Sequence, residues 1–367
     1  MKYYIIAGEA SGDLHGSRLV SALKKRDAAA NIRGWGGDLM EEAGAQIVKH
    51  IRELAFMGFL EVAKNLGTIL GNIKWCKQDI ESFKPDVLVL VDYPGFNLRI
   101  AKWAKAQGIK VLYYIAPQVW AWKENRVHDM KKSIDKMLVI LPFEQSYFAD
   151  KWQWDVTYAG HPLVEVIRDF KPKIASLSSK PVIALLPGSR KQEISLKLPV
   201  MLEAAAHFKD YQAVVAKAPA IEDAFYQDML QGYPGAVAVK NLTYELLSQA
   251  KAALVTSGTA TLETALFRVP QVVCYKGNPI SYQIAKRLIK IKYISLVNLI
   301  MDKEVVKELI QREMNAENLR QELQKILPGT SYREEMMKQY DALWNKLSAN
   351  DHASELAADA VYDLAIQ

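Results

Sequence analysis

The chain has 367 residues, of which 50% are hydrophobic and 24% charged, and its formal net charge is +6. This composition is that of a globular enzyme, and it excludes a disordered or collagen-like chain. The length suggests two domains. The positive charge is divided evenly between residues 1–170 and 171–367, so no basic tail marks a nucleic-acid-binding protein.

The two cysteines, Cys76 and Cys274, are far apart in the sequence and form no CxxC motif. This usage indicates a reducing compartment and argues against a structural zinc site. The first residues, MKYYIIAGEASGD, lack the basic start and long apolar core of a signal peptide. No window reaches about 18 apolar residues, the length of a membrane span. We therefore expect a cytoplasmic or membrane-peripheral protein.

Short apolar runs alternate with amphipathic segments of helix length, which predicts an α/β fold with parallel sheets. Strands are expected at residues 3–7, 87–91, 111–115, 137–141, 182–186, 213–216, 236–239, 253–256 and 271–275. Residues 159–181 carry prolines and a Lys/Ser-rich stretch without a strand pattern, so we expect a domain hinge there. No strand pattern returns after about residue 281, and the final helical segment is long enough to cross back to the first domain.

The first predicted strand is followed by GEASGDLHG, whose glycines are four residues apart rather than in the GxGxxG pattern of dinucleotide sites. Glycine permits a sharp turn, whereas Glu9, Ser11, Asp13 and His15 offer groups that bind hydroxyls and transfer protons. The alternative is a tight turn with a helix cap. Four polar groups within seven residues favour a substrate-binding loop.

Two strand-to-helix turns in the second half are suited to anions, because the amides at a helix start carry partial positive charge. An arginine in the first turn can also form a bidentate contact to a diphosphate. The first of these two anion turns contains Gly188, Ser189 and Arg190, and the second contains Ser257, Gly258 and Thr259. One helical turn further on, Glu263 is suited either to ribose hydroxyls or to compensating the helix dipole, and the sequence leaves both open.

Asp92 follows the strand at 87–91, next to a proline turn and aromatic residues. It is either a general base with a pKa tuned by burial or a helix cap, with no preference from the sequence. Trp120 and Trp122 fit either the core or a wall on which a ligand stacks, and the core is favoured. The segment 56–73 has apolar residues at helical spacing, three glycines and basic neighbours. These features fit a membrane interface, but an ordinary buried helix is slightly favoured on the residues alone.

Eight segments together resemble the lipid-A-disaccharide synthase family: GEASGDLHG, LAFMGFLEV, APQVWAW, LPFE, GHPLVE, LLPGSR, SGTATLE and YISLVNLI. The resemblance implies two facing Rossmann-like domains of the GT-B type, at residues 1–165 and 166–348, with a helix at 349–367 packing back on the first. It implies an inverting transfer from UDP-2,3-diacylglucosamine to 2,3-diacylglucosamine 1-phosphate, which yields lipid A disaccharide 1-phosphate and UDP. No cofactor or metal is implied.

The resemblance also implies roles for individual residues. It places the two anion turns and Glu263 at UDP, and Glu9, Ser11 and Asn298 near the sugars, where we also expect Asp13 and His15. Many relatives read PDF where this chain has Pro94, Gly95 and Phe96, so a carboxylate is absent there. We expect Asp92 to be the base, with Glu9 as the second candidate.

The resemblance further implies that the segment 56–73 is not a core helix. It implies instead a surface that contacts acyl chains and an anionic membrane, on the inner face of the inner membrane. Its contact residues are Phe56, Met57, Phe59, Leu60, Leu66, Ile69, Leu70 and Ile73. Two alternatives remain: a UDP-sugar epimerase of the same fold and a non-catalytic peripheral lipid-binding protein. Nucleic acid is not an expected partner, and the oligomeric state stays open.

Overall fold

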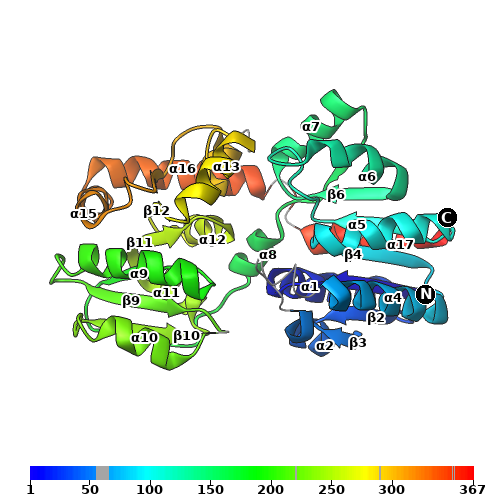
Figure 1. Cartoon of the computed structure of the whole chain (residues 1–367), viewed down its shortest axis with the longest axis horizontal. Helices are drawn as coiled ribbons and strands as arrows, with labels where there is room; N and C mark the ends of the chain where they lie inside the picture. Colours follow the sequence, from blue (N-terminus) through cyan, green and yellow to red (C-terminus); the bar gives the residue numbers. More distant parts are fainter. Residues whose placement is uncertain (55–65, 220, 289–290, 349, 351) are drawn as a thin grey trace. The chain divides into compact units, whose positions relative to one another are not determined.

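The computed structural model describes residues 1–54, 66–219, 221–288, 291–348, 350 and 352–367. The chain forms two compact units (Figure 1). Unit 1 comprises Met1–Pro162 together with Ala349–Gln367, and unit 2 comprises Leu163–Ser348. The expected boundaries followed residues 165 and 348.

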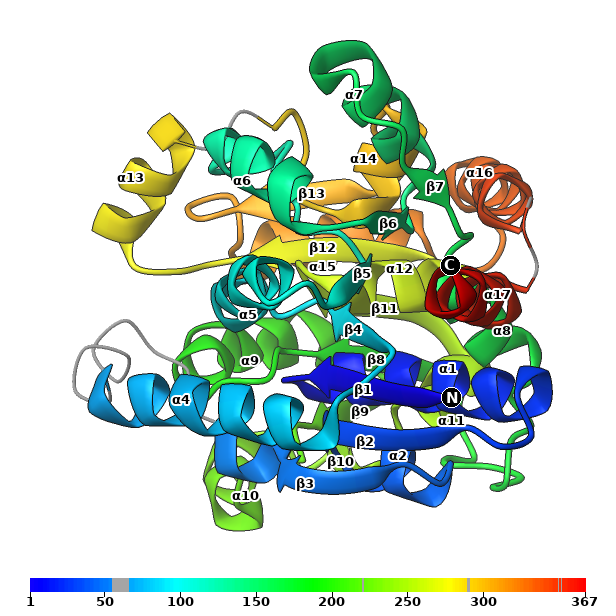
Figure 2. The same cartoon turned by 90° about the vertical axis from the view of Figure 1, so that its right-hand side faces the viewer.

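Unit 1 contains a seven-stranded parallel sheet with the order β3-β2-β1-β4-β5-β6-β7, which can be followed from bottom to top in Figure 2. The strands are β1 (Lys2–Ala7), β2 (Asn31–Gly36), β3 (Gln46–His50), β4 (Val87–Val91), β5 (Lys110–Tyr114), β6 (Lys136–Val139) and β7 (Thr157–Tyr158). Successive side chains of a strand point to opposite faces, and β1 divides accordingly. Tyr4 and Ile6 pack into one core cluster and Tyr3, Ile5 and Ala7 into the other. Because both faces of the sheet are buried, the central strands are continuous apolar runs.

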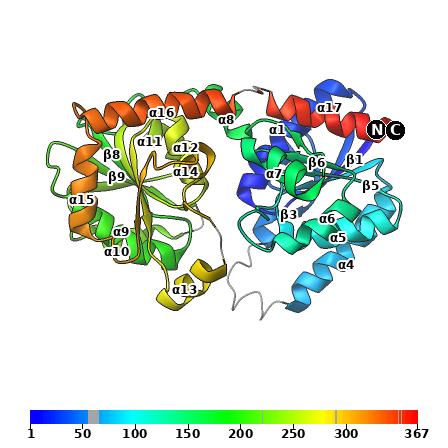
Figure 3. The same ribbon diagram turned by 90° about the horizontal axis from the view of Figure 1, so that it is seen from above.

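Helices cover both faces of this sheet (Figure 3). One face packs against α1 (Ala10–Arg26), α2 (Asp38–Glu42) and α17 (Ala353–Ile366). The other packs against α4 (Leu66–Phe83), α5 (Pro94–Ala106), α6 (Val127–Ser133) and α7 (Pro142–Trp152). Short 3-10 turns occur at Ile51–Leu54 and Glu124–Arg126.

The carboxy-terminal helix α17 completes unit 1. Its buried Ala357, Ala358 and Val361 belong to the same core cluster as α1. At its surface, Arg26 Nε of α1 lies 2.8 Å from Asp359 Oδ1, and the Arg26 guanidinium lies 4.4 Å from the centre of the Tyr362 ring. The last helix is therefore part of the core of the first unit.

Unit 2 contains a six-stranded parallel sheet with the order β10-β9-β8-β11-β12-β13. The strands are β8 (Val182–Leu186), β9 (Gln212–Lys217), β10 (Ala236–Lys240), β11 (Ala250–Thr256), β12 (Gln271–Tyr275) and β13 (Lys307–Ile310). The helices are α9 (Lys191–Ala205), α10 (Asp223–Leu230), α11 (Thr243–Gln249), α12 (Thr259–Leu266), α13 (Pro279–Leu288), α14 (Leu296–Met301), α15 (Ala316–Lys325) and α16 (Ser331–Leu347). Helix α8 (Pro162–Arg168) joins the two units.

All nine expected strands are present, and the α/β fold with two parallel sheets is confirmed. Four further strands, β2, β3, β7 and β13, were not expected. The expectation that no strand follows residue 281 was therefore wrong, because the half-exposed β13 forms one edge of its sheet. In β2 the pattern is hidden by glycine: a Cβ on Gly34 would lie 1.8 Å from the Ile5 carbonyl oxygen, so the backbones approach too closely for any side chain.

No helix in the described part of the chain combines the length and the apolar character needed to cross a bilayer.

Candidate active site

Each sheet has a point where the strand order reverses, and ligands of open parallel sheets bind beside the carboxyl ends of the strands at such points. In unit 1 this point lies between β1 and β4, where Ala7 pairs with Val91. In unit 2 it lies between β8 and β11, where Leu186 pairs with Val255. The loops that follow these four strands carry Glu9, Asp92 and both anion turns, so the topology concentrates the expected chemistry at the two reversal points.

An open pocket of about 350 Å³ lies at the reversal point of unit 2. Its walls are the loops after β8, β9 and β11 and the start of α12. Among the expected UDP ligands, the lining includes Gly188, Ser189, Ser257, Gly258, Thr259 and Glu263. Arg190 is not part of the lining; it begins α9 as an exposed residue at the edge of the same turn. The volume is within the range of small-molecule sites.

Two glycines shape the pocket. Gly188 has φ +119 and Gly258 has φ +143, backbone conformations that side chains disfavour. Gly258 is the N-cap of α12, and as a glycine it has no side chain with which to cap the amides of this helix start. Ser257 fixes the preceding turn, because its hydroxyl donates to the Ile294 carbonyl at 2.8 Å. The uncapped amides at the start of α12 are therefore available to an anion in the pocket.

Glu263 lies in the wall of this pocket, one turn inside α12. One carboxylate oxygen accepts a hydrogen bond from the Tyr244 hydroxyl at 2.8 Å. Burial raises the pKa of Glu263 above its ordinary value, and the Tyr244 hydrogen bond partly offsets this. A half-buried carboxylate oriented in this way is suited to accept hydrogen bonds from the hydroxyls of a ligand.

The reversal point of unit 1 holds Asp92 in an unusual backbone conformation. Asp92 has φ +47 and Tyr93 has φ +50, and each such non-glycine residue costs about 1–3 kcal/mol. The strained carbonyl of Asp92 accepts hydrogen bonds from Asn97 Nδ2 at 2.8 Å and from the Tyr113 hydroxyl at 2.5 Å. Burial, followed by the negative charge of Glu9, raises the pKa of Asp92 to about 6. The backbone of Asp92 is thus anchored by two hydrogen bonds, and the raised pKa of its carboxyl suits a general base.

The loop after β1 packs directly against this turn. A Cβ on Gly8 would lie 2.3 Å from Cδ1 of Tyr93, so the Tyr93 ring occupies the space that glycine leaves. Glu9 is at the N-cap of α1 and makes no side-chain cap, and Ser11 is exposed on the first turn. Glu9 and Asp92 are therefore brought together, close enough for the charge of Glu9 to act on Asp92.

Asp13 and His15 do not belong to this group, contrary to expectation. Asp13 is buried, and its carboxylate accepts hydrogen bonds from the amides of Gly37, Leu39 and Met40 at 2.7 to 3.2 Å, which holds the start of α2. His15 is 6% exposed, and burial lowers its pKa to about 4, with a smaller effect of Arg18. Asp13 therefore supports the fold, whereas the expected contact of His15 with a sugar stays a prediction.

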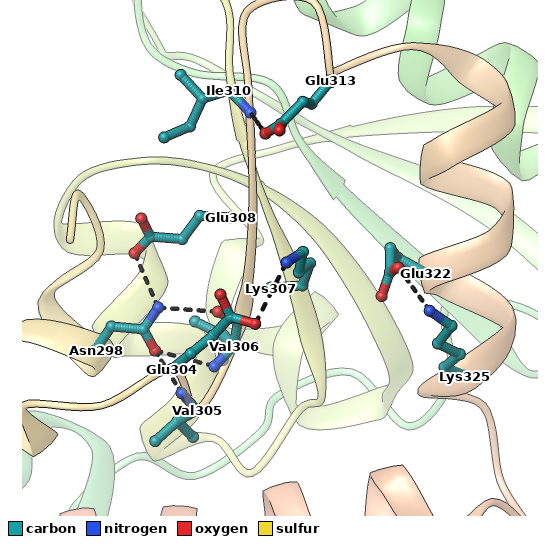
Figure 4. A network of polar contacts seen from close by, with 10 residues as sticks. All are labelled: Asn298, Glu304, Val305, Val306, Lys307, Glu308, Ile310, Glu313, Glu322 and Lys325. Atoms are coloured by element: carbon teal, nitrogen blue, oxygen red, sulfur yellow. Dashed lines mark hydrogen bonds and ion pairs between the residues drawn. The ribbon is translucent and has the colours of Figure 1, made fainter. Parts of the chain in front are cut away.

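Asn298 is also structural rather than sugar-binding. It is completely buried, and its amide oxygen accepts from the Val305 and Val306 amides (Figure 4). Its amide nitrogen donates to the Val306 carbonyl and to Glu308 Oε1, each at 2.9 Å. With all these positions occupied, Asn298 holds the turn between α14 and β13 and has no group free for a sugar.

The expected acyl-contact segment is partly described. Phe56, Met57, Phe59 and Leu60 lie outside the described residues, and Leu66 begins α4. Leu70 is 57% exposed. Ile69 is half-buried, and Ile73 is buried in the core of unit 1, so Ile73 is not a surface contact.

Glu144 is a buried residue whose hydrogen bonds were not expected from the sequence. This buried glutamate in the LPFE segment accepts hydrogen bonds from Trp120 Nε1 at 3.0 Å and from the Leu141 amide at 2.9 Å. Burial nevertheless raises its pKa to about 7. Its position three residues into a helix is a capping-box signal that the sequence contained. The expectation that Trp122 is a core residue was wrong, since it is 45% exposed beside Lys123.

Solved structures with this fold include two kinds of enzyme that act on sugars. The UDP-GlcNAc 2-epimerase of Neisseria meningitidis, bound to UDP-GlcNAc, has a TM-score of 0.69 at 13% identity, covering 99% of this chain and 100% of that one. The glycosyltransferase of kitacinnamycin has a TM-score of 0.68 at 13% identity, covering 99% and 98%. At these identities the similarity concerns the fold alone. The protein has the fold of the GT-B class, with two Rossmann-like units.

Comparison of sequences is more specific. The family profile described as lipid-A-disaccharide synthetase matches residues 3–361. The lipid-A-disaccharide synthase of Syntrophus aciditrophicus is 38% identical over 369 residues, covering 97% of this chain and 96% of the relative. The corresponding synthase of Myxococcus xanthus is 36% identical over 375 residues, covering 98% and 96%. The chain belongs to the lipid-A-disaccharide synthase family, which confirms the resemblance.

Proposed function

We propose that the protein joins UDP-2,3-diacylglucosamine to 2,3-diacylglucosamine 1-phosphate, giving lipid A disaccharide 1-phosphate and UDP. Its family membership supports a UDP-sugar-dependent glycosyltransferase that acts on lipid-linked sugars. The observation that carries the proposal is the unit 2 pocket, where two glycine turns and a carboxylate line one space at the reversal point of the sheet. This arrangement suits a nucleotide whose phosphates meet backbone amides and whose ribose meets Glu263.

In the proposed reaction, Asp92 takes the proton of the acceptor's 6-hydroxyl as its oxygen attacks the anomeric carbon. The bond from that carbon to UDP breaks on the opposite face, so the configuration is inverted. The amides at the start of α12, together with Arg190, stabilise the negative charge that appears on UDP.

Product analysis tests this function. Incubation of the protein with both diacylated substrates should release UDP and form a disaccharide monophosphate in equal amounts. The two alternatives predict other outcomes: an epimerase would convert UDP-GlcNAc without an acyl acceptor, and a lipid-binding protein would form no product. The family match favours neither alternative. Formation of an epimer, or of no product, would contradict the proposal.

The affinity for UDP should depend on pH through Glu263. The raised pKa means that acidification protonates Glu263 sooner than an ordinary glutamate, which removes acceptor capacity for the ribose hydroxyls. We therefore expect calorimetric titration to show UDP affinity weakening as the pH falls, by about tenfold at most. The variant Glu263→Gln should bind UDP more weakly, and its affinity should lack the pH dependence that Glu263 causes. Tyr244→Phe, which removes the hydrogen bond that lowers this pKa, should shift the loss to higher pH. Identical profiles for all three proteins would remove Glu263 from the site.

We further propose that unit 1 binds the surface of an anionic membrane through α4 and the segment before it. On α4, the exposed Leu70 lies one turn before Lys74, an arrangement that suits an interface of acyl chains and anionic head groups. The variant with Leu70→Ser and Lys74→Gln should bind vesicles of anionic phospholipid at least several-fold more weakly in flotation. Leu196→Ser, at an exposed position on unit 2, should bind as the wild type does. Equal loss in both variants would argue against this surface.

A further inference from the structure

An ion pair between a buried lysine and a half-buried glutamate lies beside the Gly188 turn of the unit 2 pocket. Lys197, on α9, has a side chain that is 3% exposed, and its ammonium lies 3.8 Å from Oε2 of Glu193. The other oxygen of that carboxylate lies 3.9 Å from Nη1 of Arg190. Charged hydrogen bonds are about 2.7–2.9 Å long, so Glu193 holds both cations only loosely. Glu193 itself is part of the pocket wall, whereas Lys197 is buried next to it and is not a lining residue.

The Glu193 carboxylate fills the space beside Gly188. A Cβ on Gly188 would lie 2.7 Å from Glu193 Oε2 and 3.6 Å from Lys197 Nζ. Gly188 has no side chain, which would leave this side of its backbone open to a ligand. In the structure, a carboxylate oxygen of Glu193 occupies the space, with Lys197 next to it. A negative group at this position repels an incoming phosphate unless it moves away.

We propose that Glu193 is an internal anion at the diphosphate position, and that the nucleoside diphosphate displaces it and takes Lys197 as its counter-ion. This inference rests on the proposed function, because it assigns the residues that meet the diphosphate in the same pocket. A diphosphate carries more charge and more acceptor oxygens than a carboxylate, and the buried setting of Lys197 strengthens the attraction. The Glu193 side chain is 35% exposed, so it has solvent into which to rotate.

The displacement also bears on product release. When the sugar has been transferred, UDP carries an additional negative charge, which Lys197 neutralises in the pocket. The return of Glu193 to Lys197 then competes with UDP and favours its departure. An ordinary acidic residue in the first turn of a helix, which only compensates the dipole, would not compete with the ligand.

Calorimetric titration with UDP distinguishes these roles by the sign of the effect. Glu193→Gln removes the competing charge and should tighten UDP binding about three- to tenfold. Lys197→Met removes the counter-ion with a side chain of similar length and should weaken binding at least tenfold. In the double variant, binding should be tighter than in Lys197→Met alone, because the phosphate no longer meets an unpaired carboxylate. Glu203→Gln, which removes a charge from an exposed position of the same helix, should leave the affinity unchanged.

Weaker UDP binding in Glu193→Gln would overturn the proposal, as would unchanged affinity in Lys197→Met. Thermal unfolding of each variant, together with its affinity for uridine, shows whether the nucleoside part of the site is still formed. If Lys197→Met does not fold, Lys197→Gln in the Glu193→Gln background provides the same comparison, and affinity equal to that of Glu193→Gln would again overturn the proposal. A wild-type protein that binds no UDP would instead refute the proposed function itself.

Discussion

Replacing Asp92 by asparagine should lower kcat by a factor of about 100 or more, with little change in the affinity for UDP. The amide keeps the shape of the side chain but cannot take the proton of the attacking hydroxyl. The measurement is steady-state kinetics with both diacylated substrates, combined with UDP titration. Near-normal turnover would eliminate Asp92 as the base.

The pH dependence gives a second, independent test of the same assignment. A base with a pKa of about 6 is protonated at lower pH, so kcat should fall as the pH drops through about 6. Glu9 contributes to the raised pKa through its negative charge. In the variant Glu9→Gln, the fall of kcat on acidification should therefore occur at a lower pH, and most of the activity should remain. If Glu9→Gln is inactive and Asp92→Asn is not, Glu9 is the base.

Asn97→Ala should lower the free energy of unfolding by about 1–3 kcal/mol and should also reduce kcat. Asn97 is completely buried, and its side-chain amide donates to the carbonyls of Ile6, Val91 and Asp92. These hydrogen bonds tie the ends of β1 and β4 together. Their loss leaves buried carbonyls with fewer partners and releases the strained turn that holds Asp92. Urea denaturation and steady-state kinetics measure the two effects.

Tyr113→Phe is the matched control for this prediction, because it removes a donor to the Asp92 carbonyl but keeps the ring in the core. It should reduce kcat with a smaller loss of stability than Asn97→Ala. If kcat is unchanged in both variants despite lower stability, the conformation of the turn is unimportant for the reaction.

The fold was predictable wherever strands are buried on both faces. The runs VLVLV and VIALL become β4 and β8 with the expected bounds, because only apolar side chains are tolerated there. The edge strand β13 has the sequence KELI, and β2 contains two glycines, so neither shows an apolar run. Their positions depend on neighbouring strands, which local sequence does not reveal.

For the site, the sequence identified loops better than side-chain directions. Glu9, Asp13 and His15 are in one short motif, yet Asp13 turns inward to the start of α2 and His15 is buried. Their direction depends on where α2 packs, which is a long-range property. Lys197 gave no signal, because a lysine in an amphipathic helix usually points to solvent. Only the packing of α9 on the sheet shows that it is buried next to the first anion turn.

The place of α17 within unit 1 has a consequence for how the protein is made. Ribosomes synthesise this helix after all of unit 2, although its partner α1 is made before unit 2. During translation the apolar side of α1 and the adjacent strands stay uncovered for the time needed to add more than a hundred residues. Unit 2 is able to mature on the ribosome before α17 is made, whereas the unit that holds Asp92 becomes complete only afterwards, and a nascent chain would offer chaperones a binding surface until then.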